Sequence, residues 1–221
     1  MGAQVKIGIA AHEKRIGMAY NLFREVDADF INVDNGSLGC EGCHRRVWEQ
    51  TAVMADDDEW IIVMEDDAVP VENFRQQAEQ ALAVTPPGTD VVSFYLGQMR
   101  PSAWQQFVRQ AVAQADSSKA CWITSDTALH AVTLAIRNKH VVAQMLSRTA
   151  ESIRPIDERI TLWCRQFGHA SAYTWPSLVD HRDEDPVIVR RADGAPRERG
   201  RVAWQVGRRD TWTARSVKLR P

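Results

Sequence analysis

The chain has 221 residues, of which 44% are hydrophobic and 25% are charged. That is enough for one globular domain with an ordinary core, or for one domain and a tail. No run of 18 apolar residues occurs, which argues against a membrane-spanning helix. The N-terminus lacks the charged and apolar regions of a secretion signal, so we expect a cytoplasmic protein.

The formal net charge of −2 hides an asymmetry along the chain. Residues 189–221 contain ten Lys or Arg and three Asp or Glu, a net charge of +7. Residues 1–188 contain 17 basic and 26 acidic residues, a net charge of −9. We therefore expect a folded domain over 1–188 and a basic C-terminal extension over 189–221, which would bind an anion.

Strands and helices are predicted to alternate along the domain. Apolar and β-branched runs predict strands over 5–10, 29–36, 60–64, 90–97 and 128–137, with a further extended segment over 171–183. Helical spacing of apolar residues predicts helices over 14–26, 39–54, 71–84, 104–115, 138–148 and 155–168. This alternation favours an α/β fold with a mainly parallel sheet flanked by helices.

Three carboxylates, Glu65, Asp66 and Asp67, follow directly after the apolar strand Trp60–Met64. In parallel sheets, ligands bind beyond the carboxyl ends of the strands. Adjacent carboxylates at such a place are costly unless a positive charge meets them. Mg²⁺ or Mn²⁺ suits these hard oxygen ligands and commonly also holds phosphate groups. The alternative is a solvated acidic turn.

The stretch from Cys40 to His44 reads C-E-G-C-H, which is the attachment signature of a c-type haem. Haem attachment would require export, for which the sequence shows no signal, and a structural zinc site would want a second close pair of ligands. Cys121 and Cys164 are too far apart in sequence to supply that pair. We favour a helix whose cysteines are small apolar residues, with His44 facing either the core or a ligand pocket.

The acidic motif and its surroundings resemble glycosyltransferase family 25, the lipooligosaccharide-type and collagen-type sugar transferases. The stretch "WIIVMEDDAVP" is similar to the family's I-x-L-E-D-D-A, and residues 39–48 are similar to its G-C-x-x-S-H-x-x-x-W, with Cys43 in place of Ser. Three later segments, "TDVVSFYLG", "PIDERI" and "WPSLVDHRD", follow in the family's order. The resemblance extends from about residue 5 to residue 185.

The resemblance implies a GT-A type fold, a single Rossmann-like domain that binds a nucleotide sugar, with UDP as the expected nucleotide. It implies that Asp67 binds Mn²⁺ or Mg²⁺, that Glu65 binds the metal or the ribose, and that His181 completes the metal shell. Asp66 would contact the ribose or the donor sugar. The usual D-x-D appears here as E-D-D, which leaves open which acids bind the metal.

Sugar transfer needs a base opposite the leaving group, and direct displacement would invert the anomeric centre. Asp157 and Glu158 are the candidates; their alternative role is to stabilise a helix N-terminus. His12 and Asp34 end the first two strands, and we expect both to line the nucleotide pocket with His44. A surface loop and a turn cap are their alternatives. Arg15 either meets a phosphate or lies on a solvated helix face.

The basic extension suggests the acceptor. Positive charge follows a phosphate backbone and tryptophan stacks on bases, so we favour a hydroxymethylated pyrimidine in DNA, as in phage DNA glucosylation. The residues expected to contact DNA are Arg190, Arg191, Arg199, Arg201, Arg208, Arg209, Trp204 and Trp212. A saccharide, glycolipid or protein hydroxyl is the alternative acceptor. The extension could instead bind a membrane surface or fold against the acidic domain. Outside enzymes, the alternatives are a nucleic-acid-binding module and a haem or zinc protein.

Overall fold

A computed structural model of the chain describes residues 2–183, 187 and 200–220. The domain boundary expected at residue 188, and Arg190, Arg191 and Arg199, lie outside these ranges. The described residues form an eight-stranded sheet in the order β10-β6-β8-β5-β7-β3-β1-β2, with a separate two-stranded sheet of β4 and β9. The strands are β1 Val5–His12, β2 Phe30–Asp34, β3 Trp60–Glu65, β4 Ala68–Pro70, β5 Thr89–Ser93, β6 Trp122–Ser125, β7 Thr133–Arg137, β8 Ala170–Thr174, β9 Val179–His181 and β10 Ser216–Lys218.

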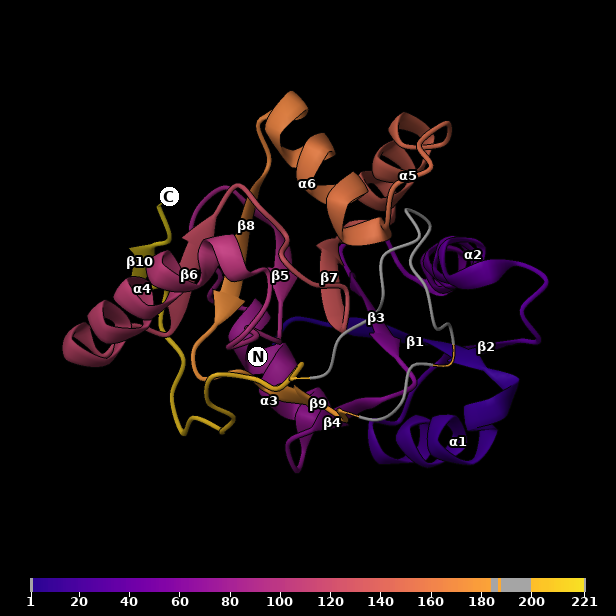
Figure 1. Ribbon diagram of the computed structural model, residues 1–221, viewed down its shortest axis with the longest axis horizontal. Helices are drawn as coiled ribbons and strands as arrows, with labels where there is room; N and C mark the ends of the chain where they lie inside the picture. The colour runs from indigo at the N-terminus through magenta and orange to yellow at the C-terminus, as the bar shows by residue number, and fades with distance from the viewer. Residues whose placement is uncertain (1, 184–186, 188–199, 221) are drawn as a thin grey trace.

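The predicted α/β class is confirmed: helices flank a large central sheet (Figure 1). Four of the seven strand pairs in that sheet are parallel, and the pairs β3·β7, β5·β7 and β6·β8 are antiparallel. The helices are α1 Ile16–Glu25, α2 Gly39–Met54, α3 Phe74–Leu82, α4 Gln105–Ser118, α5 Asn138–Arg148 and α6 Ile156–Phe167. Among the described helices, none is long and apolar enough to cross a bilayer.

The two faces of the sheet bury different helices. On one face, α1 and α3 pack against Ile7, Ile9 and Ile62; on the other, α2, α5 and α6 pack against Ile61, Val63 and Ile136. This division follows from the period-2 alternation of side chains along a strand. Because β3 is covered on both faces, it is apolar without interruption from Trp60 to Met64.

The close packing of α2 on β1 depends on Gly8. A Cβ atom at this position would lie 2.1 Å from the Thr51 hydroxyl oxygen and 2.6 Å from a Val47 methyl carbon. Only a glycine therefore lets α2 approach the strand this closely. The approach fixes the N-terminal turn of α2 beside the carboxyl ends of β1 and β3, where the acidic motif lies.

Residues 200–220 return to the sheet. Strand β10 pairs in parallel with β6, Ala203 bridges Gly97, and Val206 bridges Ser177. This part of the basic extension thus folds against the acidic domain, one of the three roles expected for it. The segment lacks hydrophobic periodicity, and its partners lie far away in sequence, so β10 was not predicted.

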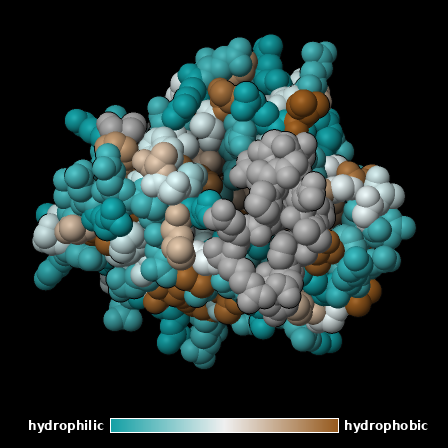
Figure 2. All heavy atoms as spheres, viewed as in Figure 1, coloured by the Kyte–Doolittle hydropathy of each residue, from teal (hydrophilic) through white to brown (hydrophobic). Residues whose placement is uncertain are grey.

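Several residues expected to contact DNA make contacts within the protein. Trp212 is 6% exposed, packs against Trp122 with ring centroids 5.8 Å apart, and donates to Gln77. The Arg209 side chain donates to the backbone carbonyls of Trp175 and Ala120 at 2.7 and 2.8 Å. Trp204 donates to Gln105, and Arg208 pairs with Glu72. The described part of the surface in Figure 2 is mostly hydrophilic, with apolar side chains in small groups.

Candidate functional site

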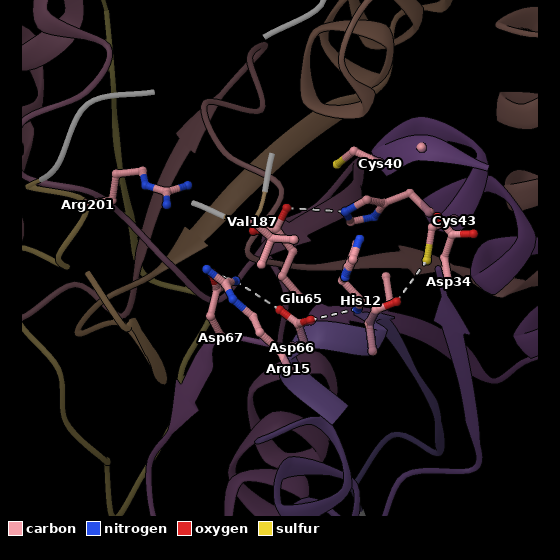
Figure 3. A pocket seen from close by; sticks show the side chains of 14 residues that line it. His12, Arg15, Asp34, Cys40, Cys43, Glu65, Asp66, Asp67, Val187 and Arg201 are labelled. Atoms are coloured by element: carbon pink, nitrogen blue, oxygen red, sulfur yellow. Dashed lines mark hydrogen bonds and ion pairs between the residues drawn. The ribbon is translucent and has the colours of Figure 1, made fainter. Parts of the chain in front are cut away.

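The acidic motif lies where parallel strands end together. In the sheet register, Ala10 of β1 is opposite Glu65 of β3, and His12 is opposite Asp34 of β2. The carboxyl ends of these three strands therefore converge at one edge. A pocket opens there. Its lining includes His12, Arg15, Asp34, Cys40, His44, the three acids and Arg201 (Figure 3).

Arg15 forms ion pairs with two of the acids. Its Nη1 lies 3.1 Å from Asp66 Oδ1 and also donates to Asp67 Oδ2. Asp66 additionally accepts the His12 backbone N–H at 2.8 Å. Burial and the neighbouring Asp67 nevertheless raise the pKa of the Asp66 carboxyl group. Of the two roles weighed for Arg15, a solvated helix face is wrong, because the guanidinium group is directed into the site.

Asp67, Glu65 and His181 form a cluster that fits a divalent cation. The short strand β4 pairs with β9 so that Ala68 is opposite His181, which brings the imidazole next to Asp67. One ligand atom from each of the three side chains lies within 4.8 Å of the other two. His181 Nε2 and Asp67 Oδ1 are 3.3 Å apart, yet neither has a hydrogen-bond partner among the described residues. Buried polar atoms without partners are costly, and a cation between them would satisfy both.

His44 reaches the same edge from α2. The imidazole is 3% exposed, and its Nε2 lies 3.2 Å from Glu65 Oε1. Burial opposes a charge on the ring, but the Cys40 sulfur and the Glu65 carboxylate outweigh it and raise the pKa of His44 well above its ordinary value. Burial likewise opposes charge on Glu65, and His44 lowers the pKa of that carboxyl group to about 2. His44 therefore faces the pocket and pairs with Glu65.

The two cysteines of the C-E-G-C-H stretch point in different directions. The Cys43 thiol donates toward the backbone carbonyl of Ala11 at 3.7 Å and is 6% exposed. Both cysteines line the pocket. Two thiols directed apart do not form the paired attachment that a c-type haem needs. Cys43 is buried in the core, as expected for both cysteines, whereas Cys40 is only partly buried.

The remaining nucleotide-pocket candidates, His12 and Asp34, both line the pocket. His12 Nδ1 accepts the Lys14 backbone N–H at 3.2 Å. Asp34 is 6% exposed and accepts from the backbone N–H groups of Gly36 and Leu38 at 2.9 and 3.1 Å. Asp34 therefore caps the turn after β2, which is the alternative role that the sequence left open. Its side chain also lines the pocket.

Asp157 and Glu158 lie in a second, larger groove. Cys40, Glu65 and Arg201 line both this groove and the pocket, so the two adjoin. Burial raises the pKa of Asp157 to about 7, with Glu65 adding to the rise. Glu158, by contrast, pairs with Arg154 at 3.0 Å. The two candidates for the base therefore differ in environment, and Asp157 has the pKa suited to proton transfer near neutral pH.

Arg201 is a pocket residue whose location the sequence did not indicate. Asp183, two residues after His181, accepts hydrogen bonds from the backbone N–H groups of Gly200 and Arg201 at 2.7 and 3.3 Å. These bonds hold the segment at 200–201 next to the end of β9. The Arg201 Nε atom is buried and has no hydrogen-bond partner among the described residues. A guanidinium group between the pocket and the groove is suited to bind an anion such as phosphate. Its basic neighbours in the sequence instead suggested a nucleic-acid contact.

The family model described as glycosyltransferase family 25 (LPS biosynthesis protein) matches residues 18–150, a span that includes α2 and the acidic motif. The chain belongs to glycosyltransferase family 25. The expected glycosyltransferase activity and the resemblance in sequence are thereby confirmed.

A solved structure is similar at low sequence identity. It is described as a glycosyltransferase involved in the glycosylation of the major capsid of PBCV-1, and it is 12% identical to this chain. The similarity covers 67% of this chain and 68% of the other, with a TM-score of 0.39. No curated protein matches the chain.

Proposed function

We propose that this family 25 glycosyltransferase uses a nucleotide sugar, with UDP as its nucleotide, and a divalent cation, Mn²⁺ or Mg²⁺. The observation that carries the proposal is the convergence of Glu65, Asp67 and His181 beside a pocket at the ends of parallel strands. The facing atoms of Asp67 and His181 lack partners among the described residues, so the donor set suits such a cation. When bound, the cation would stabilise negative charge on the donor diphosphate.

Side chains of this pocket would bind the rest of the donor. His12 and Asp34 border the side of the pocket at the ends of β1 and β2, where the nucleoside would lie. Arg201, which lines the pocket from the C-terminal segment 200–220, would contact the diphosphate. Arg15 holds Asp66 and Asp67 through ion pairs. A bound cation would compete with these ion pairs and leave the guanidinium group able to turn toward a phosphate.

The acceptor would approach through the groove that contains Asp157. The Asp157 carboxylate would take the proton of the acceptor hydroxyl group as that oxygen attacks the anomeric carbon and the nucleoside diphosphate leaves. Attack from the side opposite the leaving group would invert the anomeric centre. The raised pKa of Asp157, about 7, supports its role because a base is most effective when its pKa is near the operating pH.

The DNA acceptor stays a proposal, with a saccharide hydroxyl as its alternative. Arg209 and Trp212 make internal contacts, so support for DNA now depends mainly on the residues at 190–199, which lie outside the described ranges. A side-by-side assay with hydroxymethylated DNA and a saccharide panel separates the two. Transfer of labelled sugar to DNA alone would support the first acceptor, and transfer to a saccharide alone would support the second.

The metal proposal is tested by release of UDP from a panel of UDP-sugars, with Mn²⁺ or with EDTA. We expect release with Mn²⁺, loss of release with EDTA, and at least a hundredfold loss in Asp67→Asn, because this substitution removes a charged ligand. Asp58→Asn is the matched control, since Asp58 is exposed in the turn before β3. Undiminished release in EDTA, or in Asp67→Asn with Mn²⁺, would contradict the metal assignment.

A further inference from the structure

A second group of ligand atoms lies next to the proposed cation site and includes sulfur. Cys40, His44 and Glu65 each present one atom within 4.8 Å of the other two. Glu65 belongs to both groups. Figure 3 shows the Cys40 and Cys43 sulfurs pointing in different directions, and the Cys43 thiol donates toward the backbone carbonyl of Ala11. The three side chains thus converge on one small volume at the edge of the pocket.

The spacing within this group suits a tetrahedral ion. Zinc binds histidine nitrogen and carboxylate oxygen at about 2.0–2.2 Å, so two such ligands of one tetrahedral zinc are roughly 3.3 Å apart. The observed separation between His44 Nε2 and Glu65 Oε1 is 3.2 Å. The imidazole is also held in place, since it is 3% exposed on the face of α2 that packs against the sheet.

The chemistry of the three ligands selects the ion. A thiolate and an imidazole are soft or borderline ligands that favour Zn²⁺ over Mg²⁺ or Mn²⁺. Cys40 lies in the first turn of the 16-residue helix α2, where the helix dipole stabilises negative charge. Three protein ligands and a water molecule is the usual coordination of an open zinc site, and this site opens into the pocket.

We propose that Cys40, His44 and Glu65 form a zinc site that is separate from the Glu65–Asp67–His181 site but shares Glu65 with it. Zinc bound there would hold the Glu65 carboxylate on the side of α2. Because one carboxylate then serves two ions, zinc would weaken binding of the hard cation by Asp67 and His181. Zinc would therefore be an inhibitor of metal-dependent turnover.

Cobalt provides a direct test that does not depend on sugar transfer. Co²⁺ replaces zinc, and a thiolate ligand gives it an intense charge-transfer absorption in the near ultraviolet. The full chain, freed of metal by a chelator, is titrated with Co²⁺, and the bound cobalt is then displaced with Zn²⁺. We expect one thiolate-bound cobalt per chain and loss of its band on addition of zinc.

Substitutions identify the ligand. Cys40→Ser should abolish the band and weaken zinc binding at least tenfold, and Cys43→Ser is the matched control that should retain both. Asp67→Asn should also retain the band, because the Glu65–Asp67–His181 group contains no sulfur. Absence of the band in the unsubstituted protein, or its survival in Cys40→Ser, would overturn the proposal.

Inhibition by zinc is the second measurement, and it rests on the proposed function. Zn²⁺ should inhibit Mn²⁺-dependent release of UDP, and the zinc concentration for half inhibition should rise at least tenfold in Cys40→Ser. The cobalt band with no UDP release under any condition would support the zinc site and contradict the proposed function. UDP release with no cobalt band would support the proposed function and contradict the zinc site.

Discussion

The ionisable residues of this site have ion-pair partners or pKa values that depend on the side chains packed around them. Asp66 and Asp67 are buried against Arg15, Glu65 is paired with His44, and Asp157 lies in the groove with a pKa raised to about 7. The sequence indicated the acids because they follow a buried apolar strand, and His181 because its segment resembles that of a known family. It could not indicate the partner of each acid, since Arg15 and His44 reach the site through packing between α1, α2 and the sheet.

Asp157 gives a prediction about pH. A base must be unprotonated, so kcat/KM for transfer should rise with pH through about 7 and then level off. In Asp157→Asn, transfer should fall by about 10²–10⁴-fold and lose this dependence. Glu158→Gln is the control, because Glu158 pairs with Arg154 at the groove surface, and it should keep the pH profile. A wild-type profile in Asp157→Asn would exclude Asp157 as the base.

The same carboxyl group affects stability in the opposite direction. Its folded-state pKa is above the ordinary unfolded value of about 3.9, so the folded state binds more protons between these two values. The contribution of Asp157 to the free energy of unfolding therefore falls as pH rises from about 4 to about 7. We expect Asp157→Asn to raise Tm at pH 8 and to leave it nearly unchanged at pH 4, as measured by thermal melting. An equal effect at both pH values would contradict this explanation.

At the scale of elements, long periodic segments were predictable and short pairings were not. The predicted helix over 39–54 is α2, with the same bounds. The strand predicted over 60–64 is β3, which ends one residue later, at Glu65. The two short strands β4 and β9 bring His181 to Asp67. Strand β9 lies within the extended segment predicted over 171–183, but the three residues of β4 carry too little pattern to predict a strand. Strand β6 was missed for a similar reason, and the strand predicted over 128–137 begins only at Thr133.

The C-terminal segment gives a prediction at this scale. Removal of the Trp212 side chain would leave a cavity against Trp122 and remove one of the two hydrogen bonds that Gln77 Oε1 accepts. Trp212→Ala should therefore lower the free energy of unfolding by about 3–5 kcal/mol and lower Tm by roughly 10 °C. Tyr20→Ala, at an aromatic residue that is 46% exposed on α1, should change Tm by only a degree or two. Equal melting of the two variants would show that the segment does not dock.

At the scale of the whole molecule, the site draws on segments from almost the entire chain. The pocket includes residues from His12 near the N-terminus to Arg201 in the basic segment. The charge asymmetry of the sequence suggested that this segment meets an anion, and among the described residues of the segment Arg208 pairs with Glu72. Composition alone does not distinguish an external nucleic acid from the acidic body of the same chain, and the contacts of Arg201, Arg208 and Arg209 show that the described part meets its own chain.

Arg201 gives a prediction at this scale. If its guanidinium group binds the donor diphosphate, Arg201→Ala should raise KM for the donor by about tenfold or more, because a charge-assisted hydrogen bond contributes roughly 1.5–3 kcal/mol. Arg201→Lys should restore part of the loss, since lysine keeps the charge without the fork of donors. Arg208→Ala is the control because Arg208 is paired with Glu72 at the surface. Steady-state kinetics in which all three variants match the wild type would refute the contact.

The tie between Asp183 and the segment at 200–201 has a consequence for biosynthesis. A ribosome makes the chain from its N-terminus, so the Glu65–Asp67–His181 cluster and Asp157 are complete in sequence before Arg201 has been synthesised. A nascent chain that has emerged only as far as β9 would contain His181 but lack the Arg201 guanidinium group that lines the pocket and the groove. Full donor affinity should therefore appear late in translation, after the chain has already buried most of its core.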